Sequence, residues 1–143
     1  IHLKSTSSHD NTEELRQKSY ELRQKQAMVL NQFLDSMLTY QTDKDIFFVG
    51  DMNDNPNRKN SNIKFFADDP KVLFLTAHLR SCKNPNWDNI DHIAITPNIE
   101  SRFIKSSIRQ INIYELFKAS QAERISDHCP VVVSFDTTLP DND

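Results

Sequence analysis

Six polar residues of this chain stand at the ends of apolar runs, where ionisable side chains are uncommon. Asp51 and Asn53 directly follow one apolar run, and Asp91 interrupts a second run. Asp127 and His128 immediately precede a third run, and His2 interrupts the apolar start of the chain. Carboxylates seldom enter such segments unless they are paired or bind a metal ion. The candidate site residues are His2, Asp51, Asn53, Asp91, Asp127 and His128.

Together these side chains supply three carboxylates, two imidazoles and one amide. Oxygen ligands suit hard cations such as Mg²⁺ or Mn²⁺, and Mg²⁺ commonly takes only one or two protein carboxylates and keeps several waters. The chain has no cysteine pair or HExxH pattern that would indicate zinc, and its single glycine excludes a glycine-rich phosphate loop. If the strand ends converge, the set suits a divalent cation bound together with a phosphate.

Each feature also has a simpler explanation when it is taken alone. The aspartate and asparagine after the first run fit an Asx turn, and the Asp-His pair before the last run could cap a loop. The histidine near the start could be an ordinary strand residue, and Asp91-His92 could form a bulge or an edge charge that blocks aggregation. The coincidence of four such features in apolar settings favours a common site.

A long helix is predicted over residues 12–39, with Asp10 as its cap and two glutamates at the positive end of its dipole. Apolar residues recur at helical spacing from Leu15 to Leu38. The first half is mostly charged and should project into solvent, whereas the second half should pack on a sheet. A solvated helix face is the preferred interpretation of the basic residues Arg16, Lys18, Arg23 and Lys25.

The other elements are mainly strands. Residues 45–50 form a short, continuous apolar run, which predicts a central strand covered on both faces. The pattern predicts an α/β (α+β) fold in one domain, residues 1–143, with a mixed β-sheet and helices packed on one face. Burial is expected for Ile104, Ile108 and Ile111. The remaining expected elements are strands over 90–95, 103–113 and 129–135, a helix over 62–68, and a strand or helical turn over 72–75.

The composition is that of an ordinary globular domain, with 143 residues, of which 37% are hydrophobic and 26% charged. No stretch approaches the roughly 20 apolar residues that span a bilayer, and nothing fixes the cellular compartment. The net charge of −3 gives no basic face that would indicate nucleic acid. Cys82 and Cys129 leave a disulfide open, and Cys129 is interpreted as a small buried residue. The lone glycine, Gly50, predicts a position that needs backbone freedom.

Four motifs occur in the order and spacing of a known superfamily. Together they resemble the C-terminal motifs of the endonuclease/exonuclease/phosphatase superfamily, which includes DNase-type endonucleases, apurinic-site repair nucleases, inositol polyphosphate 5-phosphatases and neutral sphingomyelinases. Arg23-x-x-Gln26, before the GDxN strand, is also similar to the family. The resemblance spans nearly the whole chain. The four motifs are Ile1-His2-Leu3-Lys4-Ser5, Gly50-Asp51-Met52-Asn53, Ile90-Asp91-His92 and Ser126-Asp127-His128-Cys129-Pro130-Val131.

The resemblance implies roles around a Mg²⁺ or Mn²⁺ ion. Asp127 resembles the family carboxylate that contacts the metal site. Asp51 resembles the residue that aligns or deprotonates the attacking water, and it is expected to be a metal ligand as well. Asn53 resembles the amide that holds the phosphate or the nucleophile.

The resemblance also implies roles for the remaining three residues. His128 resembles the histidine that hydrogen-bonds the scissile phosphate, and Asp91 resembles the partner that orients it and favours its protonated form. His2 resembles the second phosphate-binding histidine of the DNase and sphingomyelinase branches. The implied function is metal-dependent hydrolysis of phosphoester bonds, as in a phosphodiesterase, nuclease or phosphatase, by in-line attack of water.

The substrate could be a nucleic acid, a phospholipid headgroup or a small phosphoester, and Trp87 could contact it or simply pack. The family fold is a four-layer α/β/β/α sandwich, and this chain corresponds to its C-terminal half. The N-terminal half, which supplies an asparagine and a metal-binding glutamate, is absent from the chain, so this fragment alone is expected to be inactive and its partner to be the missing half. The alternative is a degenerate or truncated family member that acts as a non-catalytic binding module.

Overall fold

The structure is a computed structural model that describes residues 1–141, so the last two residues of the predicted 1–143 domain lie outside it. None of the described helices is long and apolar enough to cross a membrane. The elements in chain order are α1 (Glu13–Tyr40), β1 (Phe47–Asp51), α2 (Lys64–Ala67), β2 (Leu73–Phe74), β3 (Asp91–Ile95), the 3₁₀ helix η1 (Pro97–Arg102), β4 (Phe103–Gln110), α3 (Ile113–Leu116), α4 (Ala119–Ile125) and β5 (Val131–Phe135).

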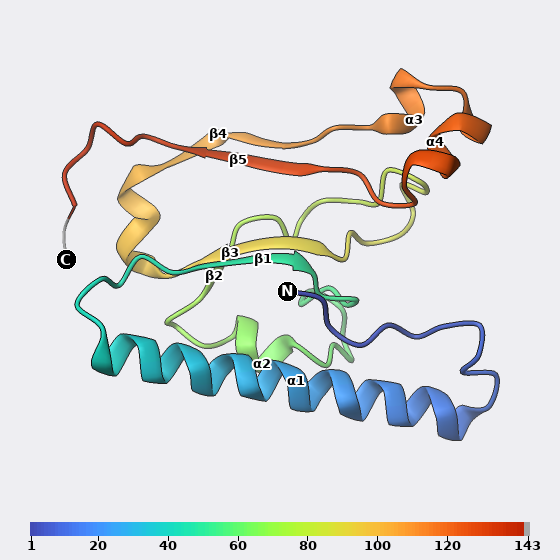
Figure 1. Ribbon diagram of the computed structural model, residues 1–143, viewed down its shortest axis with the longest axis horizontal. Helices are drawn as coiled ribbons and strands as arrows, with labels where there is room; N and C mark the ends of the chain where they lie inside the picture. The colour runs from blue at the N-terminus through green and yellow to red at the C-terminus, as the bar shows by residue number, and fades with distance from the viewer. Residues whose placement is uncertain (142–143) are drawn as a thin grey trace.

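The elements form three layers in the order helix, sheet, ribbon (Figure 1). Helices α1 and α2 cover one side of the three-stranded sheet β1-β3-β2, and the two-stranded ribbon β4-β5 lies on the opposite side. The α/β (α+β) class is therefore confirmed, and α1 and α2 lie on one face of the sheet as expected, whereas α3 and α4 lie at the ribbon (Figure 1).

The sheet itself differs from the expected mixed sheet, because every pair of named strands is antiparallel. In residues 1–141 the parallel pairing is reduced to one isolated bridge between His2 and Asp51. A helical crossover joins parallel strands, and α1 does connect these two segments, but the segment around His2 is too short to form a named strand.

Helix α1 begins and ends within one residue of its predicted bounds, but its cap is Thr12 rather than Asp10. The Thr12 side chain accepts a hydrogen bond from the backbone N–H of Leu15 at 3.2 Å. Asp10 instead accepts bonds from the Ser7 N–H and the Ser19 hydroxyl, which close the preceding loop. Threonine is among the residues preferred at the cap position. Asp10, followed three residues later by Glu13, has a similar sequence pattern, and the prediction therefore placed the cap there.

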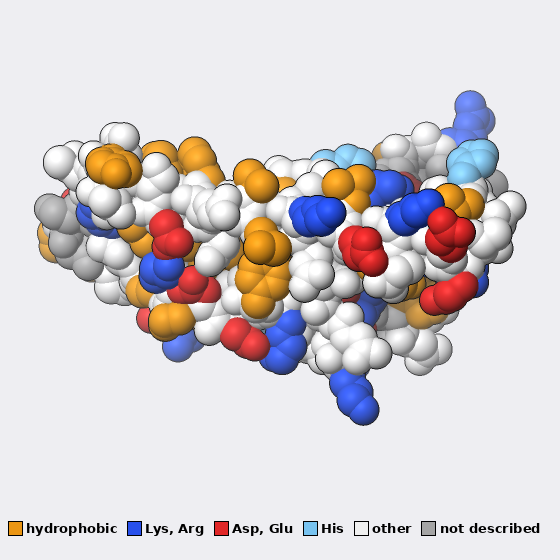
Figure 2. Space-filling view, turned by 90° about the horizontal axis from the view of Figure 1, so that it is seen from below, with side chains coloured by type: hydrophobic (Ala, Val, Ile, Leu, Met, Phe, Trp, Pro, Cys, Tyr) orange, Lys and Arg blue, Asp and Glu red, His pale blue; other side chains and the backbone are white. Residues whose placement is uncertain are grey.

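The second half of α1 is only partly covered by the sheet. Ala27 and Leu34 are fully buried in the core with Phe48 and Phe66. Along the flank, Val29 and Phe33 remain 62% and 52% exposed. Figure 2 shows this side of the molecule, where hydrophobic side chains lie among charged ones. The expected packing on the sheet is thus confirmed for one face of the helix only.

Strand β1 is an edge strand, not the predicted central one, because β3 lies between β1 and β2. Its residues alternate: Phe48 is buried against α2, while Phe47 and Val49 are about half exposed on the other face. The run is apolar on both faces because the second face also packs in part against the ribbon. The rings of Phe47 and of Phe135 in β5 meet edge to face there, with their centroids 5.1 Å apart.

Strand β4 ends at Gln110, earlier than predicted, and α3 and α4 follow where no helix was expected. The burial predicted for its isoleucines was wrong, since Ile104 and Ile111 are 41% and 38% exposed and Ile108 is only partly buried. The β4-β5 ribbon has one neighbour sheet, so one of its faces stays open. Residues 72–75 contain the short strand β2 rather than a helical turn.

Candidate active site

The two central carboxylates are brought together by the register of β1 and β3. Asp51, the last residue of β1, pairs with Asp91, the first residue of β3. Directly paired residues on antiparallel strands place their side chains on the same face about 5 Å apart. Two like charges at that distance repel one another unless cations compensate. This pairing replaces the bulge or edge-charge interpretation of Asp91.

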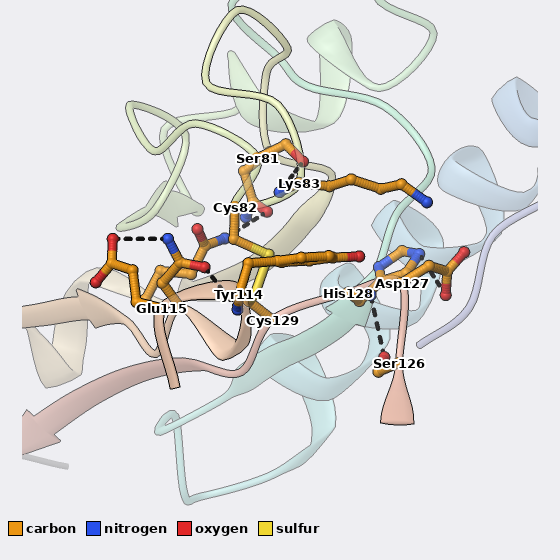
Figure 3. The surroundings of a disulfide bond; sticks show 12 residues. Ser81, Cys82, Lys83, Tyr114, Glu115, Ser126, Asp127, His128 and Cys129 are labelled. Carbon is orange, nitrogen blue, oxygen red and sulfur yellow. Dashed lines mark hydrogen bonds and ion pairs between the residues drawn. A yellow bond between two sulfur atoms is a disulfide. The ribbon is translucent and has the colours of Figure 1, made fainter. Parts of the chain in front are cut away.

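His128 reaches this pair from the loop between α4 and β5. Its Nδ1 lies 2.7 Å from Oδ2 of Asp91, and because an ionised carboxylate can only accept, the imidazole N–H donates. Its backbone N–H donates to the Ser126 hydroxyl at 3.0 Å. The next residue, Cys129, is 97% buried and joined by a disulfide to Cys82. Figure 3 shows the disulfide beside Asp127 and His128.

The disulfide resolves the alternatives left open for the two cysteines. Cys82 lies 47 residues before Cys129, in the loop that leads to β3, and the bond ties this loop to the segment that carries His128. Cys129 is buried as predicted, and as half of a disulfide it is no nucleophile. Neither spacing nor motif could reveal the pairing, because two cysteines far apart carry no framework pattern.

Asn53 is held in the turn after β1 by bonds to both neighbouring segments. Its side-chain amide donates to Oδ2 of Asp51 and to the carbonyl of Leu3, both at 2.9 Å. Its backbone has a φ of +52°, a conformation that asparagine tolerates better than most residues. The turn predicted from Asp51-x-Asn53 is thus real, and the same residues face the candidate site.

His2 lies beside Asp51, with its Nε2 3.5 Å from Oδ2 of that carboxylate. The neighbouring Leu3 N–H donates to the Asp51 carbonyl at 2.9 Å, which fixes the backbone at this point. The His2 side chain itself is 74% exposed. It therefore flanks the carboxylates from the solvent side.

Burial and charge shift the pKa values of the central pair. Burial raises the pKa of Asp91 and outweighs the opposing effect of the His128 hydrogen bond and charge. Burial alone would lower the pKa of His128, but the hydrogen bond from its ring to Asp91, with the charges of Asp91 and Asp51, raises it above its ordinary value. The arrangement therefore favours a protonated imidazole next to the two carboxylates.

The residues that could hold a metal ion are Asp51, Asp91 and His128. One ligand atom from each lies within 4.8 Å of the others. The carboxylate oxygens of the two aspartates fit Mg²⁺ or Mn²⁺, whereas the His128 ring already donates to Asp91. Asp127 lies outside this group: its side chain is 76% exposed and its Oδ1 is 4.0 Å from Nε2 of His128. Its role as a metal ligand stays a prediction.

A cleft of about 540 Å³ opens beside these side chains and is lined by Asn53, Asp91 and His128. Trp87, 58% exposed, stands among its lining residues and is therefore not part of the core. The backbone of Trp87 is fixed by two hydrogen bonds of 2.9 Å within its own loop. The cleft is large enough for a small organic phosphate.

Sequence reasoning missed three buried residues that support the site: Arg23, Asp54 and His92. Arg23 was interpreted as part of a solvated helix face, yet it is 96% buried. His92 is 99% buried, its Nε2 lies 3.0 Å from the Asp54 carbonyl, and burial lowers its pKa to about 4. The available signals were the Arg23-x-x-Gln26 resemblance for Arg23 and, for Asp54, the run of polar residues after Gly50, which is too long for a simple turn.

Comparison with known proteins adds no assignment. No protein-family model matches the chain, and no curated protein matches it. The chemistry of the site is therefore argued from its residues.

Proposed function

We propose that this chain carries the active site of a metal-dependent phosphoester hydrolase of the endonuclease/exonuclease/phosphatase type. The observation that carries the proposal is the juxtaposition of the Asp91–His128 hydrogen bond with Asp51 on the neighbouring strand. A carboxylate that orients a protonated imidazole, next to a second carboxylate, can serve both a phosphate and a cation. The fold class and the four ordered motifs agree with the proposal.

Each residue has a role that its position allows. His128, protonated and oriented by Asp91, donates a hydrogen bond to a phosphate oxygen. Asn53 donates both of its amide hydrogens to Leu3 and Asp51, so its role is to accept a hydrogen bond from the attacking water through Oδ1. Asp51 orients that water and accepts its proton. His2 provides a second donor from the solvent side of Asp51.

The donor set fits a hard divalent cation, held by Asp51 and Asp91 with Asp127 as a further candidate. Such an ion, when bound, supplies Lewis-acid stabilisation of the charge on the phosphate oxygens. Because phosphoryl transfer depends mainly on positioning and electrostatics, the residues need only hold the attacking water in line with the phosphorus and its leaving group and bind the cation that would compensate the charge.

The test is Mg²⁺-dependent release of product by the full-length protein from DNA, sphingomyelin and a phosphoinositide in parallel. We expect one substrate class to be hydrolysed, activity to vanish with a chelator, and Asp51→Ala to reduce kcat by at least about 10³-fold. Asp68→Asn, an exposed residue of the α2 region, should leave kcat unchanged. Full activity of Asp51→Ala would contradict the mechanism.

Binding without hydrolysis would instead support the non-catalytic module. The chain has one tryptophan, Trp87, at the cleft. Its fluorescence therefore reports occupancy of the cleft independently of turnover. A substrate that quenches Trp87 in both the wild type and Asp51→Ala, with no product formed in either, would overturn the enzyme proposal.

A further inference from the structure

Arg23 on α1 is a buried guanidinium beside the candidate site. Only 4% of the residue is exposed, although arginine is rarely buried unless it is paired and hydrogen-bonded. Its hydrogen-bond and ion-pair partners come from two other segments of the chain. These two segments are the ones that carry His2 and Asn53.

The first set of contacts holds the segment after His2. The Arg23 Nε donates to the carbonyl of Lys4 at 2.8 Å, and one of its terminal nitrogens donates to the Thr6 hydroxyl at 3.1 Å. Gln26, one turn later, accepts the Lys4 N–H at 2.7 Å. Helix α1 therefore satisfies both backbone polar groups of Lys4. The carbonyl of Leu3, one residue earlier, is the acceptor for the Asn53 side chain.

The second contact reaches the turn after β1. The other terminal nitrogen of Arg23 lies 3.9 Å from Oδ2 of Asp54, the residue after Asn53. Asp54 is 97% buried and accepts bonds from the Asn62 N–H at 2.6 Å and the Ser61 hydroxyl at 3.1 Å. Arg58 lies 3.5 Å from the other oxygen of Asp54, so the two arginines together compensate the charge of a carboxylate that anchors the turn.

We propose that Arg23 is a positioning residue, which with Gln26 sets the distance between the His2 segment and the Asn53 turn. Asn53 bridges the same two segments through Leu3 and Asp51, so a shift of either segment stretches its hydrogen bonds. The inference rests on the proposed function for its catalytic consequence. Its structural content, the dependence of Asn53 geometry on Arg23, stands independently of that function.

The planar fork of arginine is required for this role. One guanidinium serves the Lys4 carbonyl, the Thr6 hydroxyl and Asp54 in three directions at once. Lysine keeps the positive charge opposite Asp54, but its three N–H donors lie on one nitrogen, so it cannot reproduce the spread of contacts to both segments. Arg23→Lys therefore keeps the positive charge at this position and removes the hydrogen-bonding geometry of the guanidinium, so the effect of the geometry is measured alone.

The experiment compares Arg23→Lys and Gln26→Ala with the control Lys25→Gln, an exposed position on the same helix. Two readouts are measured in the full-length protein: the NMR resonances of the Asn53 side-chain amide with hydrogen exchange of the Leu3 N–H, and kcat with KM. We expect Arg23→Lys and Gln26→Ala to move the Asn53 resonances and to speed Leu3 exchange at least about tenfold. The control should change neither.

The kinetic expectation is a loss of kcat of about 10- to 100-fold with KM changed less than about twofold, because misplaced groups affect the transition state more than substrate binding. Unmoved Asn53 resonances in a folded Arg23→Lys protein would overturn the inference. So would a loss of activity explained entirely by a lower folded fraction. If the wild type hydrolyses nothing, the proposed function fails, whereas the NMR readout still decides the role of Arg23.

Discussion

The hydrogen bond between Asp91 and His128 decides how the candidate site can work. A free imidazole is largely neutral at neutral pH, whereas here the adjacent carboxylates raise the pKa of His128 against the opposing effect of burial. The protonated ring is a donor at Nε2 as well as at Nδ1. The pair therefore supplies a fixed cationic donor where a phosphate would lie.

Replacing Asp91 by asparagine should shift the pH dependence of hydrolysis. The raised pKa of His128 keeps the ring protonated to higher pH, so activity is lost as the pH rises through that pKa. Asp91→Asn removes the negative charge and leaves a neutral amide oxygen as the acceptor, which lowers the pKa of His128 and moves the loss of activity, the basic limb of the profile, to lower pH. The profile of kcat/KM against pH measures the shift, and NMR titration of the His128 ring checks it.

The matched comparison is Asp127→Asn. Its carboxylate is 76% exposed and 4.0 Å from the ring, so its charge is screened and the basic limb should move much less. An unchanged basic limb in Asp91→Asn would show that His128 is not the group that titrates.

Gly50 needs its missing side chain for two reasons. Its φ of +142° is a conformation that other residues rarely adopt, and an added Cβ would collide with the carbonyl oxygen of Ile1. Gly50→Ala should therefore lower the free energy of unfolding by about 1–3 kcal/mol and displace the His2 segment. Urea unfolding measures the loss.

The control is the neighbouring Val49→Ala, at a half-exposed position, which should lower the free energy of unfolding by less than about 1 kcal/mol. Equal losses in the two variants would contradict this account.

Much of the site was predictable from single residues, since polar side chains in apolar strands are costly and therefore informative. Five of the six candidates, His2, Asp51, Asn53, Asp91 and His128, lie together in the structure. Asp127 lies at the margin because only its neighbour turns inward. The burial of Arg23 was not predictable from the charge pattern, because a buried arginine on a charged helix half has the same pattern as an exposed one, although the Arg23-x-x-Gln26 resemblance had marked the residue.

At the scale of elements, the sequence predicts the position of a helix or strand well where the apolar residues follow a long periodic pattern. The bounds of α1 follow from its apolar spacing. The order of strands was not predictable, because a short apolar run does not distinguish a central strand from an edge strand whose second face packs on a ribbon. The helices α3 and α4 have four and seven residues, too short for a periodic signal.

The disulfide links the loop that precedes β3 to the segment that leads into β5. Cys82 belongs to the loop before β3 and Cys129 to the start of the β5 segment. Closing a loop of 47 residues in the unfolded chain corresponds to about 4 kcal/mol in the chain-entropy model, and measured effects are commonly about 2–4 kcal/mol. Reduction with dithiothreitol should therefore lower the urea midpoint of the protein.

The control for this prediction is the double variant Cys82→Ser with Cys129→Ser. It should unfold near the midpoint of the reduced wild type and should not respond to dithiothreitol. Identical midpoints for the oxidised and reduced wild type would mean that the two loops are held by other contacts.

For the whole molecule, the layers explain why the candidate site lies where it does. Helix α1 anchors the His2 segment from one side of the sheet, while the loop before β5 brings His128 from the ribbon side (Figure 1). The carboxylates of β1 and β3 lie between them. The site therefore depends on all three layers, and its function rests on whether these layers hold a cation at the two strand ends.

The most direct test of that claim is paramagnetic broadening by Mn²⁺ in amide NMR spectra, which detects weak as well as tight binding. We expect broadening centred on Asp51, Asp91 and His128, abolished in Asp51→Asn and unchanged in Asp68→Asn, which alters an exposed ion pair with Lys64. Broadening spread over exposed carboxylates, or retained at the strand ends in Asp51→Asn, would contradict the account.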